Sequence, residues 1–406
     1  MSIWNNELNG KRILMLLENC AYPKDDRVRH EAKTLAAAGY QVSVIAPASQ
    51  GQPWREVLDG VDIYRYPNPP SANGLAGYLW EYGYSMVAIF VVSLFVFLSK
   101  NFDFIHAHQP PDTFALIGGF YKLFGKRYVF DHHDLAPELY FFARFGGQGN
   151  RFLYRILIWF EALSFRLASH VITTNESYKE IAMNRGHVLE KRITVVRNGP
   201  DVREMQSSHV EKALRDSGKT IIGYVGVTGV QDGVDNLMRA IRHLVCDMGR
   251  SDFLCVIVGS GSAMPYLKSL ANKLEISSYV LFTGWINSQE EVAKYLNTMD
   301  ICVAPEPSDP YNRRSTAAKV MEYMAFGKPI VSFDLPEHRF TAQQAAVYAR
   351  PDDEMDFAQK IAMLMDNPEQ CEILSKAGYD RIETELAWPH QARKLVEAYN
   401  DITLRF

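Results

Sequence analysis

Short apolar runs alternate along the chain with longer segments in which apolar residues recur every three or four positions. The first run occupies residues 12–17, a helical pattern follows over residues 28–38, and a second run begins after Gly39 at residues 41–47. A buried strand, a helix and a second strand in this order predict the opening βαβ unit of a doubly wound parallel sheet.

The same alternation predicts two domains. In the first half, further strands are expected at residues 61–65, 104–107, 128–130, 171–173 and 193–197. Residues 198–219 turn polar and charged, which is typical of an inter-domain connection. The alternation restarts with TIIGYVG, FLCVIVG, YVLFTG, ICVAP and PIVSF. The sequence therefore predicts an α/β protein with one doubly wound domain over residues 1–197, a linker over 198–219, and a second doubly wound domain over 220–387.

A helix is predicted to begin at Trp388, with Pro389 in its first turn. Two parallel-sheet domains joined by a linker are expected to face each other across a cleft at the carboxyl ends of both sheets. Ligands of such sheets bind outside those ends, so the loops that follow the strands are where chemistry is expected.

Length, charge and cysteine usage narrow the class of protein. A chain of 406 residues is long enough for two domains. A formal net charge of -4 gives no electrostatic basis for binding nucleic acid. The five cysteines are scattered, without a CxxC pair, which indicates reduced thiols in a cytoplasmic protein rather than disulfides or metal ligands.

Two apolar stretches raise the question of a membrane. Residues 86–98 (MVAIFVVSLFVFL) are fewer than the roughly 20 that a membrane-spanning helix needs, so a buried helix is expected there rather than an anchor. Residues 140–166 combine aromatic and basic side chains. Such a segment suits peripheral contact with the inner face of a membrane, and it equally suits a core helix.

The clearest candidate site follows the strand at residues 301–304. A polar loop leads to a helix that is expected to open at Ser315 or Thr316 and to stop at Gly327. Ser315, Lys319 and Glu322 would then share one helix face. A cation and free N–H groups at a helix start favour phosphate, and a carboxylate about one turn further in suits sugar hydroxyls. The alternative is a buried helix with a solvated polar stripe.

A second candidate is the loop after residues 128–130, which begins Asp131, His132, His133, Asp134. Adjacent residues rarely face one metal ion, so one histidine held by a neighbouring carboxylate is the favoured interpretation. The alternative is a turn with a hydrogen-bonded histidine. His106 and His108 alternate on a strand, and one is expected to point into the sheet layer and the other toward its end.

Glycines punctuate several loops of the second half. Gly226 and Gly229 follow its first strand and would allow backbone to approach a phosphate closely. Gly259 and Gly261 form a similar turn, for which tight loop geometry is an equal explanation. Asn198 and Gly199 mark a turn that is expected to serve geometry alone.

The order of these parts resembles glycosyltransferase family 4, the retaining enzymes of the GT-B fold. The resemblance rests on HDL, RNGPD, YVG…DGVDNLMRAI, IVGSGSAMPYLKSLA, VLFTGWI, ICVAP and KVMEYMAFGKPIV, and it runs over nearly the whole chain. It implies a nucleotide-sugar donor held by the second domain, an acceptor on the first, no obligatory metal or cofactor, and a final helix over 388–406 that returns to the first domain.

Two residues carry over from the family. Glu322 matches the glutamate that binds the donor ribose, and His133 matches the histidine near the sugar and the reacting phosphate, followed by Asp134. The family's first motif glutamate falls instead on Arg314. The arginine and lysine that hold the diphosphate fall at about Val227 and Asp232, so the usual phosphate clamp is missing from its usual place.

We expect the positive charge to have moved to the start of the motif helix, where Arg313, Arg314 and Lys319 would bind the diphosphate beside Ser315 and Thr316. Replacing Arg314 or Lys319 with alanine is then expected to lower kcat with little loss of stability. The alternative is that Arg313 and Arg314 are solvated loop charges.

The resemblance favours a retaining glycosyltransferase that moves a sugar from a UDP-sugar to a glycan or lipid-linked acceptor in surface polysaccharide synthesis. Front-face attack needs no nucleophile, whereas Asp131, Asp134 and Glu138 are the candidates for a carboxylate nucleophile. Two other functions stay open: a sugar-nucleotide epimerase of the same fold, and an inactive nucleotide-sugar-binding or scaffold protein.

Overall fold

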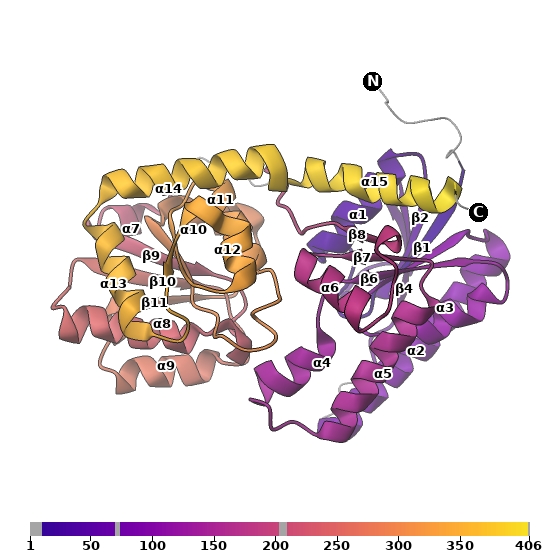
Figure 1. Cartoon of the computed structure of the whole chain (residues 1–406), viewed down its shortest axis with the longest axis horizontal. Coiled ribbons are helices and arrows are strands. Elements are labelled where there is room, and N and C mark those ends of the chain that lie inside the picture. The colour runs from indigo at the N-terminus through magenta and orange to yellow at the C-terminus, as the bar shows by residue number, and fades with distance from the viewer. Residues whose placement is uncertain (1–9, 70–73, 203–208, 405–406) are drawn as a thin grey trace. The chain divides into compact units, whose positions relative to one another are not determined.

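The computed structural model describes residues 10–69, 74–202 and 209–404 (Figure 1). The chain forms two compact units. Unit 1 comprises residues 1–137, 150–198 and 390–406, and unit 2 comprises residues 138–149 and 199–389. The linker expected over residues 198–219 is divided: Asn198 belongs to unit 1, and residues 199–202 and 209–219 belong to unit 2. Within them a short helix, α7 (Lys212–Arg215), buries Leu214, and Arg215 pairs with Asp300 at 2.6 Å.

Unit 1 is built on an eight-stranded sheet in the order β3-β4-β2-β1-β5-β6-β7-β8. All neighbouring strands are parallel except β3 and β4, which pair antiparallel. The strands are β1 (Arg12–Leu16), β2 (Gln41–Pro47), β3 (Arg55–Leu58), β4 (Val61–Tyr66), β5 (Phe104–His108), β6 (Arg127–His132), β7 (His170–Thr173) and β8 (Ile193–Val195).

Helices cover the sheet of unit 1. Asp25 caps α1 by accepting a hydrogen bond from the Val28 amide at 3.0 Å, and Asn150 and Asn175 cap α5 and α6 in the same way. The helices are α1 (Asp26–Ala37), α2 (Gly74–Ser99), α3 (Phe114–Lys122), α4 (Ala136–Glu138, in part unit 2), α5 (Arg151–Leu167), α6 (Glu176–Asn184) and α15 (Trp388–Leu404, unit 1 from His390).

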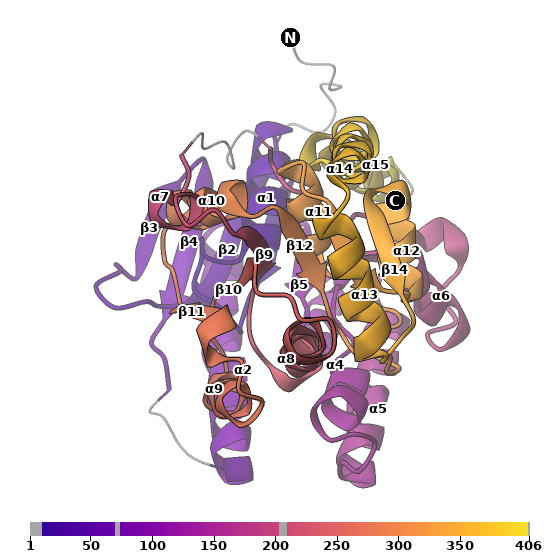
Figure 2. The same cartoon turned by 90° about the vertical axis from the view of Figure 1, so that its left-hand side faces the viewer.

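Unit 2 holds a six-stranded parallel sheet in the order β11-β10-β9-β12-β13-β14 (Figure 2). Its strands are β9 (Thr220–Val225), β10 (Phe253–Val258), β11 (Val280–Gly284), β12 (Ile301–Ala304), β13 (Ile330–Phe333) and β14 (Ala346–Ala349). Its helices besides α7 are α8 (Val234–Arg242), α9 (Met264–Lys273), α10 (Gln289–Thr298), α11 (Ala318–Ala325), α12 (Pro336–Ala342), α13 (Glu354–Met365) and α14 (Pro368–Arg381).

Both faces of the second sheet are buried, as doubly wound folds require. In β9, Ile222 and Tyr224 pack into the core beneath α8 and α13, whereas Ile221 and Val225 pack into the core beneath α10 and α11. This alternation of neighbouring side chains is the period of a strand. The prediction of two doubly wound α/β domains is confirmed. Strands β3 and β14 were not expected, because both are edge strands whose side chains are incompletely buried.

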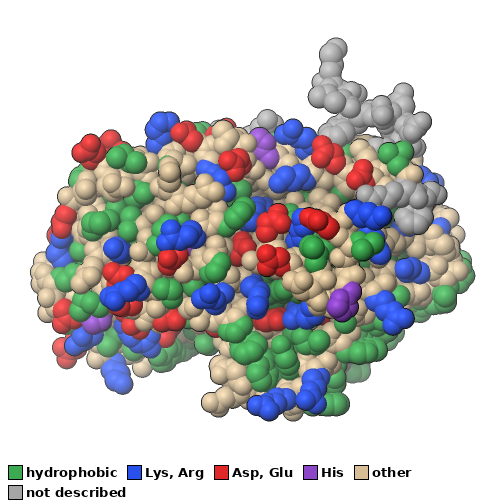
Figure 3. All heavy atoms as spheres, in the orientation of Figure 1, with side chains coloured by type: hydrophobic (Ala, Val, Ile, Leu, Met, Phe, Trp, Pro, Cys, Tyr) green, Lys and Arg blue, Asp and Glu red, His purple; other side chains and the backbone are tan. Residues whose placement is uncertain are grey.

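The helix predicted at residues 86–98 is present, but it is buried on one side only. The helix α2 spans 26 residues, and its segment Trp80–Ser99 is long and apolar enough, by length and composition, to cross a membrane, with a mean hydropathy of 2.0. Only 22% of that segment is buried. Hydrophobic side chains also gather over α5 in the space-filling view (Figure 3). A large apolar surface on unit 1 therefore faces outward.

Candidate functional site

The candidate residues gather at the point in each sheet where the strand order reverses. In unit 1, β1 lies between β2 and β5, and in unit 2, β9 lies between β10 and β12. At such a point the two neighbouring loops leave in opposite directions, and ligands bind there. Each unit therefore carries its own group of polar side chains, and each is described separately.

In unit 1 the centre of the group is the carboxylate of Asp131, at the carboxyl end of β6. Arg27 binds it with two hydrogen bonds of 2.7 Å, from Nε to Oδ2 and from Nη2 to Oδ1. Arg27 also contacts Glu31 Oε1 at 3.0 Å and donates to Asn198 Oδ1 at 2.6 Å. The expectation that Asn198 serves turn geometry alone is therefore wrong, because its side chain helps hold Arg27 in place.

The pKa values of the two buried carboxyl groups, Asp131 and Glu31, are shifted in opposite directions. Burial alone would raise the pKa of Asp131, but the Arg27 guanidinium and hydrogen bonds from His108 and His133 outweigh it, and that pKa lies well below its usual range. Burial raises the pKa of Glu31 well above its usual range, against the weaker attraction of Arg27. The Arg27 guanidinium thus stabilises the charged form of Asp131 more than that of Glu31.

His106 and His108 lie on the same face of β5, and the expectation that they point to different places is wrong. Residues two apart on a strand share a face, and the two rings stack with centroids 4.3 Å apart. Burial lowers the pKa of both, so they are neutral in the folded protein. The Tyr399 hydroxyl, on α15, bonds to His106 Nδ1 at 2.9 Å.

Glu31, His106, His108 and Asp131 each offer an atom within 4.8 Å of the others, a spacing that a metal ion could use. The guanidinium of Arg27 already contacts both carboxyl groups. A divalent cation would therefore meet a buried positive charge at contact distance, which is unfavourable in a low-dielectric interior. The cluster is an ion pair with a neutral histidine stack and does not fit a metal.

His133 is the histidine that a carboxylate holds, as the sequence predicted. Its Nδ1 donates to Asp131 Oδ2 at 3.1 Å, and its side chain is 13% exposed. Because Nδ1 carries the proton, Nε2 is the nitrogen left for a ligand. Asp134 lies beside it, but its Oδ1 accepts a hydrogen bond from the Leu135 amide at 2.8 Å. His132 is a core residue that contacts Glu161 at 3.1 Å.

In unit 2 the corresponding centre is the ammonium group of Lys319, whose side chain is 11% exposed. It donates to Glu306 Oε1 at 2.6 Å and to the Tyr224 hydroxyl at 2.9 Å, and it lies 3.4 Å from Asp232 Oδ1. Burial disfavours the ammonium, but attraction to Glu306, Tyr224 and Asp232 outweighs it and raises the pKa of Lys319 well above its usual range. Lys319 is charged and held in place.

The partners of Lys319 are unequal. Burial raises the pKa of Asp232 above its usual range, whereas attraction to Lys319 overcomes burial and keeps the pKa of Glu306 below its usual range. Oε2 of Glu306 and Oγ1 of Thr228 are buried and make no hydrogen bond within residues 10–69, 74–202 and 209–404. Water can satisfy buried polar atoms of this kind, and Oε2 of Glu306 also lies 3.8 Å from Nε2 of His338.

The glycine loops bring backbone close to this ammonium. Gly226 has a φ of 147°, and a Cβ there would lie 3.3 Å from Cε and 3.7 Å from Nζ of Lys319. Gly229 donates its amide hydrogen to Asp232 at 2.9 Å. A Cβ on Gly259 would strike the Gly226 carbonyl oxygen at 2.0 Å, so tight packing of two loops explains Gly259.

The helix α11 begins at Ala318, not at Ser315 or Thr316 as expected. The preceding segment folds into turns held by Asp309, whose carboxylate accepts hydrogen bonds from the Tyr311 and Asn312 amides. Such local side-chain bonds compete with a helix. Ser315 therefore does not share a helix face with Lys319. The Thr316 hydroxyl donates to Glu337 at 3.3 Å.

The remaining predicted donor residues occupy two places. Glu322 lies one turn into α11 from Lys319 and is half-buried. Arg313 and Arg314 are exposed and lie in the loop that precedes the helix, where they bond to Ser308 and to the Pro310 carbonyl. Of Arg313, Arg314 and Lys319, the three residues expected to bind the diphosphate, Lys319 lies beside the loop that contains Gly226, whereas the two arginines bond within the loop before α11.

Sequence reasoning missed Arg27, Glu31, Glu306 and Tyr224. Arg27 and Glu31 lie four positions apart on α1, and both are on its buried side. Charged residues are rarely buried unless they are paired, so this spacing could have indicated a buried polar site. Glu306 follows the strand β12 directly, at the edge where ligands bind. No local pattern in the sequence links Tyr224, which points inward from β9, to Lys319.

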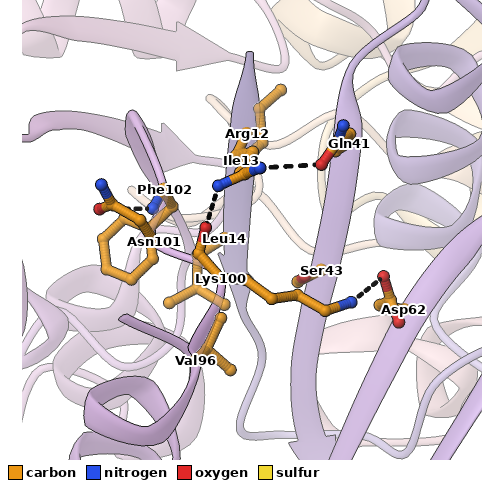
Figure 4. Close-up of a pocket in the computed structure, with 10 residues that line it drawn as sticks. All are labelled: Arg12, Ile13, Leu14, Gln41, Ser43, Asp62, Val96, Lys100, Asn101 and Phe102. Carbon is orange, nitrogen blue, oxygen red and sulfur yellow. Dashed lines mark hydrogen bonds and ion pairs between the residues drawn. The ribbon is translucent and has the colours of Figure 1, made fainter. Parts of the chain in front are cut away.

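The small cavity in Figure 4 lies at the opposite, amino-terminal edge of the first sheet. Its volume is about 10 Å³, room for at most one water molecule. Lys100 donates to Asp62 at 2.6 Å across it, and Arg12 contacts Gln41 at 3.0 Å and the Lys100 carbonyl. This ion pair and these hydrogen bonds close the edge of the sheet and leave no space for a substrate.

Comparison with known proteins gives the chain a context. A model of a glycosyl transferase 4-like domain matches residues 25–199, and a model of glycosyl transferases group 1 matches residues 219–367. The uncharacterized glycosyltransferase MJ1607 of Methanocaldococcus jannaschii is 29% identical over 180 residues, which cover 42% of this chain and 44% of that protein. The match thus spans less than half of the relative's length.

Solved structures resemble the whole chain. Sucrose-phosphate synthase from Thermosynechococcus elongatus superposes with a TM-score of 0.79 at 17% identity, covering 98% of this chain and 100% of that one. Anabaena Alr3699/HepE in complex with UDP-glucose gives 0.72 at 14% identity, covering 96% and 99%. At these identities the likeness establishes the fold.

Proposed function

Because this chain belongs to the glycosyltransferases of the GT4 type, with the GT-B fold, we propose that it transfers a sugar from a UDP-sugar to a glycan or lipid-linked saccharide, with retention of anomeric configuration. We place this reaction in surface polysaccharide synthesis in the cytoplasm. The observation that carries the donor assignment is the buried Lys319 ammonium, held beside Gly226 and close to the start of α11.

The proposed donor site replaces the missing clamp in part. An ammonium and a helix N-terminus at one point favour a diphosphate, and Glu322 is available further along α11 for ribose hydroxyls. Arg313 and Arg314 remain candidates for a second contact from the exposed loop. The choice of UDP follows the Anabaena neighbour, which is a complex with UDP-glucose.

We propose front-face attack for the transfer. The acceptor oxygen bonds to the anomeric carbon, the bond from that carbon to the phosphate oxygen breaks, and the hydroxyl proton passes to the leaving phosphate. Asp131 is unsuited to act as a nucleophile, because its two oxygens accept hydrogen bonds from Arg27, His108 and His133. Its role is to hold His133, whose Nε2 is left for the donor sugar or phosphate.

Nucleotide binding tests the proposal directly. UDP should raise the melting temperature of the wild type by several degrees when its concentration is about 100 times Kd, which corresponds to about 2.7 kcal/mol. Glu322→Ala should lose that response, while Glu369→Ala, which removes an exposed glutamate of α14, should keep it. An equal response to UDP, GDP and ADP, or no response to any of them, would contradict the donor assignment.

Removal of the held histidine should slow the reaction. We expect His133→Ala to lower kcat about a hundredfold, the effect of removing one positioned polar group at a reacting centre. Transfer assays with a labelled UDP-sugar measure this. His187→Asn is the control, because His187 is exposed at a φ of 52° that asparagine tolerates. Equal turnover in both variants would remove His133 from the mechanism.

A further inference from the structure

The helix α2 is apolar on both sides. Its inner side packs on the sheet of unit 1 and buries Ile89, Ser93 and Val96. At 100° per residue, Val87, Val91 and Leu98 fall on the opposite side, and they are 64%, 57% and 82% exposed. A helix that covers a sheet in water carries polar residues on that outer side. The outer side of α2 is instead built for an apolar environment.

A neighbouring helix carries a mixed stripe of aromatic and basic residues. On α5, Phe152, Arg155, Trp159 and Arg166 fall within one narrow sector and are exposed. The acidic residue of α5, Glu161, is buried, where it binds Arg185 at 2.6 Å. The exposed surface of α5 therefore carries positive charge and no negative charge.

The two helices belong to one surface because α3 contacts both. Phe90 of α2 meets Phe120 of α3 with ring centroids 5.1 Å apart, and Lys122 at the end of α3 donates to the Leu167 carbonyl of α5 at 2.6 Å. The three helices pack on the same core, and α3 connects α2 and α5, which Figure 2 shows apart from each other. We call this surface the outer apolar face; its members are Trp80, Val87, Val91, Leu98, Leu116, Leu123, Phe152 and Trp159.

We propose that the outer apolar face rests on the surface of a lipid bilayer with anionic headgroups. Apolar and aromatic side chains suit the boundary between headgroups and acyl chains, and the flanking arginines suit anionic phosphates. α2 does not cross the bilayer, because its inner side is packed against the protein and the chain continues from Ser99 directly into β5, inside the sheet. The helix lies in the plane of the membrane.

This proposal goes beyond the transfer reaction and does not depend on it. A bilayer is favoured over a protein partner because the charges exposed on α5 have one sign and alternate with aromatic residues. A second copy of the chain is disfavoured for the same reason, since the like charges of two such faces would meet.

Vesicle flotation tests the proposal with the full chain. The wild type should float with vesicles of phosphatidylcholine and phosphatidylglycerol, and less with phosphatidylcholine alone. The double variant Val91→Glu/Leu98→Glu should bind at least about tenfold more weakly, and Arg155→Gln about fivefold more weakly. Ile373→Glu is the control, because Ile373 is 56% exposed on α14 of unit 2, outside the face.

Equal flotation of the double variant and Ile373→Glu, or no flotation of the wild type, would overturn the proposal. The proposal would also be overturned if light scattering showed a dimer for the wild type and a monomer for the double variant, because a second copy of the chain would then cover the face. Melting temperatures without vesicles show that the variants fold, and UDP binding by the same variants keeps this outcome separate from that of the donor assignment.

Discussion

Replacement of Arg27 with methionine should lower the free energy of unfolding of unit 1 by about 3–5 kcal/mol. The Arg27 side chain is 5% exposed and that of Asp131 is fully buried. Loss of the guanidinium therefore leaves an ionised carboxylate in the interior without its main partner, and the cost of that unpaired charge exceeds what the ion pair itself contributes. Hydrogen exchange of the amides of β1, β5 and β6 in urea reports unit 1 alone.

The matched control is Lys33→Met on the same helix. Lys33 pairs with Asp59 at 3.6 Å, with side chains 38% and 50% exposed, so the loss should be below about 1 kcal/mol. If Arg27→Met lowers the free energy of unfolding no more than Lys33→Met does, Asp131 is not held as an anion.

The pH dependence of that difference follows from the pKa of Asp131. Its folded pKa lies below the unfolded value of about 3.9, so its contribution to stability is fully present above the unfolded pKa. The contribution is lost as the pH falls through the folded pKa. The gap between wild type and Arg27→Met should therefore narrow in acid. A gap that stays constant down to the acid transition would contradict this account.

Replacement of Lys319 with methionine should lower the stability of unit 2 by about 3–5 kcal/mol and also weaken UDP binding. This prediction differs from the expectation of little structural loss for Lys319, because its removal would leave buried Glu306 without the ammonium group that contacts it at 2.6 Å. The double variant Lys319→Met/Glu306→Gln removes both charges and should recover most of the stability. It should not recover UDP binding, if the ammonium holds the diphosphate.

These two readouts separate structure from function at Lys319. Recovery of both stability and UDP binding in the double variant would show that Lys319 is a structural partner of Glu306 and no more. Arg314→Ala is the comparison at an exposed position. It should change stability by less than about 0.5 kcal/mol while lowering kcat, if the loop arginine makes the second contact to the diphosphate.

The two doubly wound domains and the position of the candidate loops could be predicted from the sequence. Strands buried on both faces read as continuous apolar runs, and β1 and β9 were visible as such because burial of a strand is a local property of its side chains. His133 and Lys319 were found for the same reason, since polar residues directly after a strand or inside a helix start are local signals.

Which charged side chains contact each other could not be predicted from the sequence. Arg27 and Asp131 are 104 positions apart, and Lys319 and Tyr224 are 95 apart, so no local pattern connects them. The tertiary structure also decided the start of α11, because Asp309 binds the preceding backbone, and the outward side of α2. An apolar helix has the same sequence pattern whether protein or membrane covers it; packing decides which side is left exposed.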